Sequence, residues 1–167
     1  MKAVVYKSTG SWYVVKTEDS KFFNARIKGV FKLDAITSTN PIAVGDWINI
    51  EPEDTAEQTM IITEIFDRHN YVVRSSPQQH KERHIVASNV DQALLIATLR
   101  EPKTSTGFID RFLISCEASH IPAQIILNKI DVQREKEKQL AAYIQSVYEP
   151  LGYPVHLASF QLGEGIE

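Results

Sequence analysis

Asn128, Lys129 and Asp131 follow an apolar run at residues 125–127, and their types suit the recognition of a purine base. A short apolar run bounded by polar residues predicts a buried strand, and open α/β sheets bind ligands at the carboxyl ends of their strands. A carboxylate accepts two parallel hydrogen bonds, and guanine presents two adjacent donors, its ring N–H and its exocyclic amine. Because adenine lacks this donor pair, a buried Asp131 would reject it.

The two neighbouring side chains extend this interpretation. Asn128 can bind the carbonyl and N7 edge of guanine or tie neighbouring loops together, and Lys129 can lay its aliphatic stem over the base plane. The alternative is that Asp131 only caps the helix that follows. The pattern stands after a predicted strand and before a predicted helix, and this position favours the base-binding interpretation.

The composition is that of an ordinary globular protein. The chain has 167 residues, of which 43% are hydrophobic and 23% charged, so one or two small domains are expected. The net charge of −3 gives no overall basic field for nucleic acid. A single cysteine, Cys116, excludes an intrachain disulfide. We find no signal peptide, no apolar run of membrane-spanning length and no metal-spaced histidines, so we expect a cytoplasmic protein without a membrane partner or a metal site.

The first part of the chain, residues 1–74, predicts a β barrel. Five short strands are expected, at residues 2–8, 11–17, 21–33, 47–51 and 59–66. The five-stranded OB-fold is the common barrel of this size, and it often binds oligonucleotides. The basic residues that we single out for RNA contact are Arg26, Lys28 and Lys32, near the aromatic residues Trp12, Tyr13, Phe22 and Phe23, and Lys81 and Arg83 further along. The alternative is a barrel that binds nothing and supports its neighbour.

The second part, residues 86–167, predicts an α/β domain with a parallel sheet, after a polar linker at residues 75–85. Strands are expected at 91–98, 123–127 and 154–158, and helices at 107–120 and 133–149. We expect Thr106 to cap the first helix and Asp110 to lie in its first turn.

Several segments together resemble one family, the circularly permuted, ribosome small-subunit-dependent GTPases known as RsgA or YjeQ. The base motif NKID at 128–131 looks like the guanine-specificity motif of GTPases, and it stands directly behind an OB-like barrel. The other matching segments are STGSWY at 8–13, NPIAVGD at 40–46, NVDQ at 89–92 and FIDRFL at 108–113. The resemblance covers nearly the whole chain.

The resemblance implies a GTP hydrolase that binds the 30S subunit late in its maturation, with the barrel on 16S rRNA. It implies that Asn128, Lys129 and Asp131 bind the base of GTP or GDP, with Ala158 and Ser159 helping. It also implies Mg²⁺ with the nucleotide, zinc in the family's C-terminal domain, and a monomeric full-length protein.

The chain departs from the family pattern after its base motif. In the family, the phosphate loop, both switch motifs and the zinc-binding domain follow the point where this chain stops. No Gly-x-x-x-x-Gly-Lys-Ser/Thr segment occurs in the 167 residues, so nothing here is expected to neutralise the triphosphate. We therefore expect an N-terminal portion with no catalytic residue and no Mg²⁺ ligand, unable to hydrolyse GTP alone.

Two other functions stay open on the sequence. The first is a stand-alone RNA-binding OB module whose second half is a non-catalytic α/β scaffold. It predicts RNA binding that weakens with salt and shows no nucleotide preference. The second is a different nucleotide-binding α/β enzyme, which the absence of Gly-x-Gly-x-x-Gly after any predicted strand disfavours.

Overall fold

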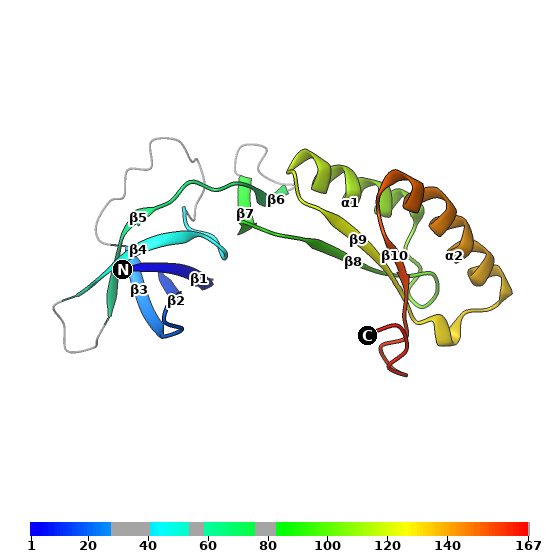
Figure 1. Ribbon diagram of the computed structural model, residues 1–167, viewed down its shortest axis with the longest axis horizontal. Helices are drawn as coiled ribbons and strands as arrows, with labels where there is room; N and C mark the ends of the chain where they lie inside the picture. The colour runs from blue at the N-terminus through cyan, green and yellow to red at the C-terminus, as the bar shows by residue number, and fades with distance from the viewer. Residues whose placement is uncertain (28–40, 54–58, 76–82, 167) are drawn as a thin grey trace. The chain divides into compact units, whose positions relative to one another are not determined.

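The computed structural model describes residues 1–27, 41–53, 59–75 and 83–166. These residues form two compact units, Met1–Val90 and Asp91–Glu167. The division lies a few residues beyond the sequence-based boundary at residues 85 and 86. The first unit contains a barrel and a hairpin, and the second contains a parallel sheet with two helices (Figure 1).

Five strands close into a barrel in the order β1-β2-β3-β5-β4, which confirms the predicted fold of this part. Alternate residues of each strand point inward, as the pleat of a β-strand requires, and small and branched apolar side chains fill the interior. The strands are β1 (Lys2–Thr9), β2 (Trp12–Thr17), β3 (Phe22–Ile27), β4 (Trp47–Pro52) and β5 (Met60–Ile65). The fully buried core includes Ala3, Val5, Tyr13, Val15, Ala25, Ile48, Ile50 and Ile62.

A two-stranded hairpin follows the barrel where the sequence predicts a linker. It consists of β6 (Tyr71–Ser75) and β7 (Arg83–Ser88), which pair antiparallel. Ala87 forms an isolated bridge with Val44, which precedes β4, so this hairpin belongs to the first unit. The sequence analysis did not predict these two strands, because the polar segment between them led us to interpret the region as a linker.

A buried carboxylate, Asp46, joins the start of β4 to the end of β7. It is fully buried and accepts hydrogen bonds from Arg68 Nε at 2.6 Å, Arg68 Nη2 at 2.5 Å and Ser88 Oγ at 2.5 Å. The Ala43 N–H donates to it at 2.8 Å. At Gly45, whose φ is +92°, an added Cβ would lie 2.0 Å from the Ser88 carbonyl oxygen. The barrel and β7 are therefore packed too closely here for a side chain.

The second unit is a three-stranded parallel sheet in the order β10-β9-β8. Leu95, Ile125 and Leu127 are buried on one face, whereas Leu94 and Ile96 are exposed on the other. Both helices cover the buried face (Figure 1), and neither is long and apolar enough to cross a membrane. The elements are β8 (Ala93–Thr98), α1 (Thr106–Ala118), β9 (Ala123–Asn128), α2 (Glu135–Tyr148) and β10 (Val155–Leu157), with 3₁₀ turns η1 (Ile130–Val132) and η2 (Glu149–Leu151).

The start of α1 differs from the prediction by one residue. Ser105, not Thr106, caps the helix, because its hydroxyl accepts a hydrogen bond from the Phe108 N–H at 3.3 Å. Asp110 lies beyond the first turn and accepts a hydrogen bond from the Tyr148 hydroxyl at 2.6 Å, which ties α1 to α2. Burial and the Asp110 carboxylate raise the pKa of Tyr148 to about 12.

Candidate nucleotide-binding site

The parallel register brings the carboxyl ends of the three strands to one edge of the sheet. Thr98 of β8 lies opposite Asn128 of β9, and Leu127 of β9 lies opposite Leu157 of β10. The chain segments that follow these strands therefore start next to one another. This edge is where open α/β sheets bind their ligands, and all the predicted base-binding residues belong to these segments.

Asn128 ties two of these segments together. Its Oδ1 accepts a hydrogen bond from the Lys129 N–H at 2.7 Å and another from the Phe160 N–H at 3.0 Å. This geometry matches the second of the two roles that the sequence suggests for Asn128. No described residue accepts a hydrogen bond from its amide nitrogen, so that donor stays available to a ligand.

Lys129 turns the chain sharply and reaches the segment after β8. Its backbone is left-handed, with φ 64° and ψ 42°. Its ammonium group donates a hydrogen bond to the Glu101 carbonyl at 2.5 Å. The Arg100 guanidinium donates to the Val132 carbonyl at 3.1 Å, so two bonds of opposite direction connect the segments after β8 and β9.

Asp131 lies in η1 with its side chain exposed. Its Oδ1 accepts a hydrogen bond from Ser159 Oγ at 2.6 Å, and no described residue donates to its Oδ2. The alternative role as a cap of α2 is wrong, because α2 begins after Arg134, whose backbone N–H donates to Glu137 at 3.0 Å. The carboxylate is thus oriented by one neighbour and open on its other oxygen.

Ala158 and Ser159 are fully buried behind this carboxylate. The Ala158 N–H donates to the Leu127 carbonyl at 3.0 Å, and the Ser159 N–H donates to the Glu164 carbonyl at 2.9 Å. Both N–H groups are therefore engaged within the chain. What the sequence did not predict is the hydroxyl of Ser159, which orients Asp131; its signal was a serine that ends the strand next to β9.

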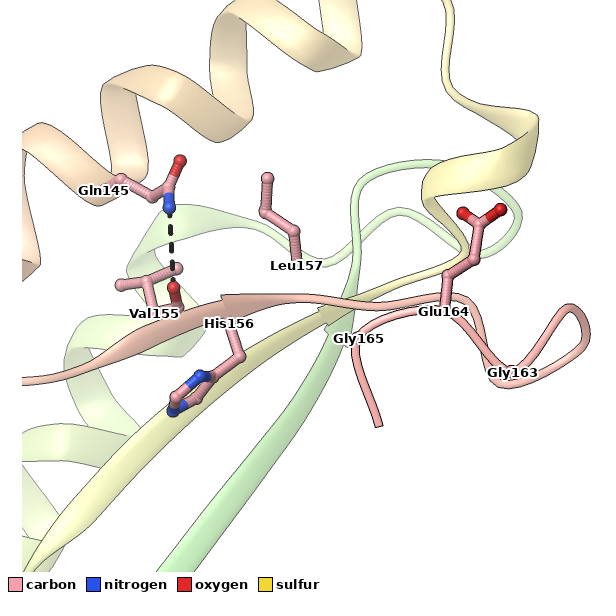
Figure 2. Close-up of a pocket in the computed structure, with 7 residues that line it drawn as sticks. All are labelled: Gln145, Val155, His156, Leu157, Gly163, Glu164 and Gly165. Carbon is pink, nitrogen blue, oxygen red and sulfur yellow. Dashed lines mark hydrogen bonds between the residues drawn. The ribbon is translucent and has the colours of Figure 1, made fainter. Parts of the chain in front are cut away.

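An open hollow lies beside β10, next to these residues. Gln145 donates to the Val155 carbonyl at 3.4 Å across it, and Figure 2 shows Leu157 and His156 leaving the strand on opposite faces. An added Cβ at Gly165 would lie 2.2 Å from the Leu157 carbonyl oxygen, so Gly165 packs tightly against β10. The hollow measures about 760 Å³ and is lined by Gln145, Val155, His156, Leu157, Gly163, Glu164 and Gly165.

The predicted RNA-binding residues are only partly described. Arg26 lies on β3 and forms a two-point ion pair with Glu53, with Nε 3.0 Å from Oε2. Arg83 begins β7. Lys28, Lys32 and Lys81 lie outside the described residues. Of the four aromatic residues named with them, Tyr13 belongs to the barrel core and the partly buried Phe23 packs against it, whereas Trp12 and Phe22 are exposed.

Two family models match the chain and together cover almost all of it. The model described as "RsgA N-terminal domain" matches residues 2–61, and the model described as "RsgA GTPase" matches residues 65–167. The first match covers β1 to β4 and the first two residues of β5. The second spans the hairpin and the α/β unit, including the site at the end of β9.

Curated relatives agree with these models. A protein from Cytophaga hutchinsonii named "Small ribosomal subunit biogenesis GTPase RsgA" is 46% identical over 167 residues, which are 100% of this chain and 54% of the relative. A relative of the same name from Bacteroides fragilis is also 46% identical, over 100% of this chain and 53% of its own length. The chain thus spans about half the length of the curated relatives that it matches.

Solved structures give the same answer for the fold. YjeQ from Thermotoga maritima superposes with a TM-score of 0.77 at 26% identity, over 99% of this chain and 54% of YjeQ. YloQ, described as a circularly permuted GTPase, superposes with a TM-score of 0.69 at 29% identity, over 95% of this chain and 51% of YloQ. With family models matching both units and the sheet edge carrying the guanine-type motif, the chain belongs to the RsgA family of small ribosomal subunit biogenesis GTPases.

Proposed function

We propose that this chain supplies the guanine-recognising half of a GTPase that acts in biogenesis of the small ribosomal subunit. The observation that carries the proposal is the Asp131 carboxylate, oriented by Ser159 at 2.6 Å and open on its second oxygen. It stands at the carboxyl end of the central strand of a parallel sheet, where such folds bind ligands.

The chemistry of the site suits guanine. Asp131 Oδ2 accepts one of the two adjacent guanine donors, and Oδ1 accepts the other through its remaining lone pair. The Asn128 amide donates to the N7 and carbonyl edge, and the aliphatic stem of Lys129 covers the base plane. Because the N–H groups of Ala158 and Ser159 bond within the chain, we assign these two residues to the support of Asp131.

In our proposal, these 167 residues do not bind the phosphates of the nucleotide. The chain contains no Gly-x-x-x-x-Gly-Lys-Ser/Thr segment, whose backbone amides and lysine would cradle them. Mg²⁺ neutralises charge on the phosphates during hydrolysis, and we assign no Mg²⁺ ligand and no catalytic residue to these 167 residues. We therefore propose that the chain alone binds the base and does not hydrolyse GTP.

The names of the relatives support the site of action that we propose. Their names link them to the small ribosomal subunit, and we propose that this protein acts there in the cytoplasm, with its barrel on 16S rRNA. The five-stranded barrel supports this assignment, because OB-folds bind oligonucleotides through an outer strand face and neighbouring loops.

Base selectivity tests the proposal. We expect GMP to bind the 167-residue chain at least tenfold more tightly than AMP, because adenine would leave the Asp131 acceptors unpaired. The affinity for GDP should lie within about threefold of that for GMP, since the chain has no phosphate loop to bind the second phosphate. The measurement is a titration of the ¹⁵N-labelled chain followed by NMR. Equal affinity for AMP and GMP would contradict the proposal and leave the barrel's RNA contacts as the function.

A further inference from the structure

A row of outward-facing side chains crosses four strands of the barrel. The register pairs Trp47 of β4 with Val4 of β1, Val4 with Lys16 of β2, and Lys16 with Phe22 of β3. Side chains along a strand point alternately to its two faces. Because Ala3 and Val5 point into the core, Val4 between them faces outward. The row therefore lies on the outer surface of the barrel.

Further aromatic rings and a second lysine flank this row. The Lys16 ammonium lies 5.5 Å from the ring centroid of Tyr6 and 5.7 Å from that of Phe22. Tyr6 and Phe22 meet edge to face, with their centroids 5.4 Å apart. At the other end, the Lys2 ammonium lies 4.7 Å from the Trp47 ring and 5.6 Å from that of Phe66. We call these residues the aromatic–lysine stripe: Lys2, Tyr6, Lys16, Phe22, Trp47 and Phe66.

The rings of the stripe do not support the barrel core. Tyr6 is 51% exposed, Phe22 57% and Trp47 37%, whereas the core residue Tyr13 is only 2% exposed. Single exposed apolar residues are common on protein surfaces, but a cluster of them marks an interaction site. Each lysine ammonium lies over two of these rings within the range of a cation–π interaction, and Tyr6, Phe22 and Trp47 nevertheless keep the exposed fractions given above.

The electrostatics of this surface favour an anionic partner, although the whole chain carries a charge of −3. All the charges within the stripe are positive. Among the described residues, Glu18 and Asp19 follow β2, Glu64 lies opposite Asn49, which pairs with Lys2, and the exposed Asp67 follows Phe66. Asp19 forms an ion pair with Lys21 at 2.8 Å, and Glu64 accepts a hydrogen bond from Asn49 at 2.6 Å.

We propose that the aromatic–lysine stripe binds a single-stranded segment of RNA, which rests on the RNA-binding role proposed for the barrel. Unpaired bases stack on Phe22 with Tyr6 and on Trp47, while Lys16 and Lys2 contact phosphates. Stacking on aromatic rings beside a basic surface is how proteins hold single-stranded nucleic acid. Phe22 and Trp47 are three strand spacings apart, about 14 Å along the surface, so the two platforms take different bases of one segment.

The chemistry of the surface argues for unpaired RNA over a duplex. A base pair within a helix hides both faces of its bases, and recognition of duplex RNA uses its shape, phosphates and 2′-hydroxyls. Exposed rings contribute nothing to such contacts. The outer face of the second and third strands is also a surface that OB-folds use for oligonucleotides, and Lys16 and Phe22 lie on those strands.

The test is the affinity of the chain for a fluorescein-labelled 12-nucleotide single-stranded RNA, measured by fluorescence anisotropy. We expect Phe22→Ala to weaken binding roughly tenfold, and Tyr6→Ala with Phe22→Ala to weaken it further, as loss of base stacking does. Lys16→Gln should reduce the slope of log affinity against log salt by about 0.7, the value for one phosphate contact in single strands. A duplex of the same sequence should lose less than threefold from the ring substitutions.

Matched controls come from exposed residues of the second unit. Tyr143→Ala, Phe108→Ala and Lys136→Gln remove the same side-chain types and should leave RNA affinity unchanged. Tyr6→Phe with Phe22→Tyr keeps both rings and should retain tight binding. All variants should bind GMP like the parent chain, since the base site lies in the other unit.

A spectroscopic readout reports stacking directly. The chain has two tryptophans, so Trp12→Phe leaves Trp47 as the sole one, and RNA should quench its fluorescence in step with the anisotropy change. If the Tyr6→Ala/Phe22→Ala variant bound RNA as tightly as the parent chain, or if RNA bound without quenching Trp47, the proposed role of the aromatic–lysine stripe would be overturned. The RNA-binding role of the barrel would remain intact. Absence of RNA binding by the parent chain would overturn both and point to a protein partner, whereas the GMP titration decides the guanine site independently.

Discussion

Asp131 and Ser159 are far apart in sequence but joined by a hydrogen bond in the fold, and we propose that they recognise the base together. Ser159 is fully buried, and its hydroxyl donates to Asp131 Oδ1 at 2.6 Å while accepting a hydrogen bond from the Leu162 N–H at 3.3 Å. A buried hydroxyl with two partners has a fixed orientation. It therefore holds the carboxylate in one rotamer before a base arrives, which lowers the entropy cost of binding.

Ser159→Ala tests this positioning role. Without the hydroxyl, Asp131 gains rotamer freedom, and we expect GMP affinity to fall roughly three- to tenfold, in line with the loss of one hydrogen bond to a charged group. The measurement is the NMR titration with GMP. Ser146→Ala, which removes an exposed hydroxyl from α2, is the matched control. An unchanged GMP affinity in Ser159→Ala, with the fold intact, would mean that Asp131 needs no partner.

The residues of the base motif could be predicted from sequence, but their partners could not. Asn128, Lys129 and Asp131 stand in a short, recognisable pattern after an apolar run. The bonds from Ser159 to Asp131 and from Lys129 to Glu101 depend on which strands are neighbours in the sheet. Local patterns carry no information on that pairing, so these contacts needed the fold.

At the scale of elements, short runs of apolar, β-branched and aromatic residues were a sufficient guide to several strands. The predicted strand at residues 2–8 corresponds to β1 (Lys2–Thr9), and that at 123–127 to β9 (Ala123–Asn128). The hairpin of β6 and β7 was missed because its stability comes from main-chain pairing and from contacts with the barrel. The cap of α1 was misplaced by one residue because Ser105 and Thr106 have equivalent hydroxyls.

The Asp46 network predicts a large stability effect in the first unit. Asp46→Ala leaves the Arg68 guanidinium without its carboxylate partner in a nearly buried position. Breaking a buried ion pair in this way costs about 3–5 kcal/mol, so we expect the free energy of unfolding of the first unit to fall by that amount. Both tryptophans, Trp12 and Trp47, belong to this unit, and tryptophan fluorescence during urea denaturation therefore reports its unfolding.

Glu18→Ala provides the control for this substitution. Glu18 is an exposed carboxylate of the same unit, and its removal should change the free energy of unfolding by no more than about 0.5 kcal/mol. A loss below about 1 kcal/mol for Asp46→Ala would contradict the account, because it would place the Asp46–Arg68 pair in the class of exposed ion pairs.

At the scale of the molecule, we propose that the two units have separate recognition roles, one for RNA and one for the guanine base. The first carries the aromatic–lysine stripe on its barrel, and the second carries the guanine-type motif at the edge of its sheet. The family models divide the chain earlier, between residues 61 and 65, so the hairpin of the first unit falls in the second match. The chain spans about half the length of its curated relatives, and our assignment gives this half the base and the RNA and leaves the phosphates elsewhere.

The measurement that tests the central claim most directly compares the affinities of the Asp131→Asn variant and the parent chain for GMP and XMP. Asp131→Asn replaces an acceptor with an amide donor, so it should weaken GMP binding by about ten- to a hundredfold, as expected for a hydrogen bond to a charged group. It should also improve binding of XMP, whose xanthine base carries a carbonyl where guanine carries the amine. Asp91→Asn, an exposed aspartate of the same unit, is the control. Loss of GMP with gain of XMP confirms that Asp131 reads the guanine edge, and unchanged affinity for both nucleotides would contradict it.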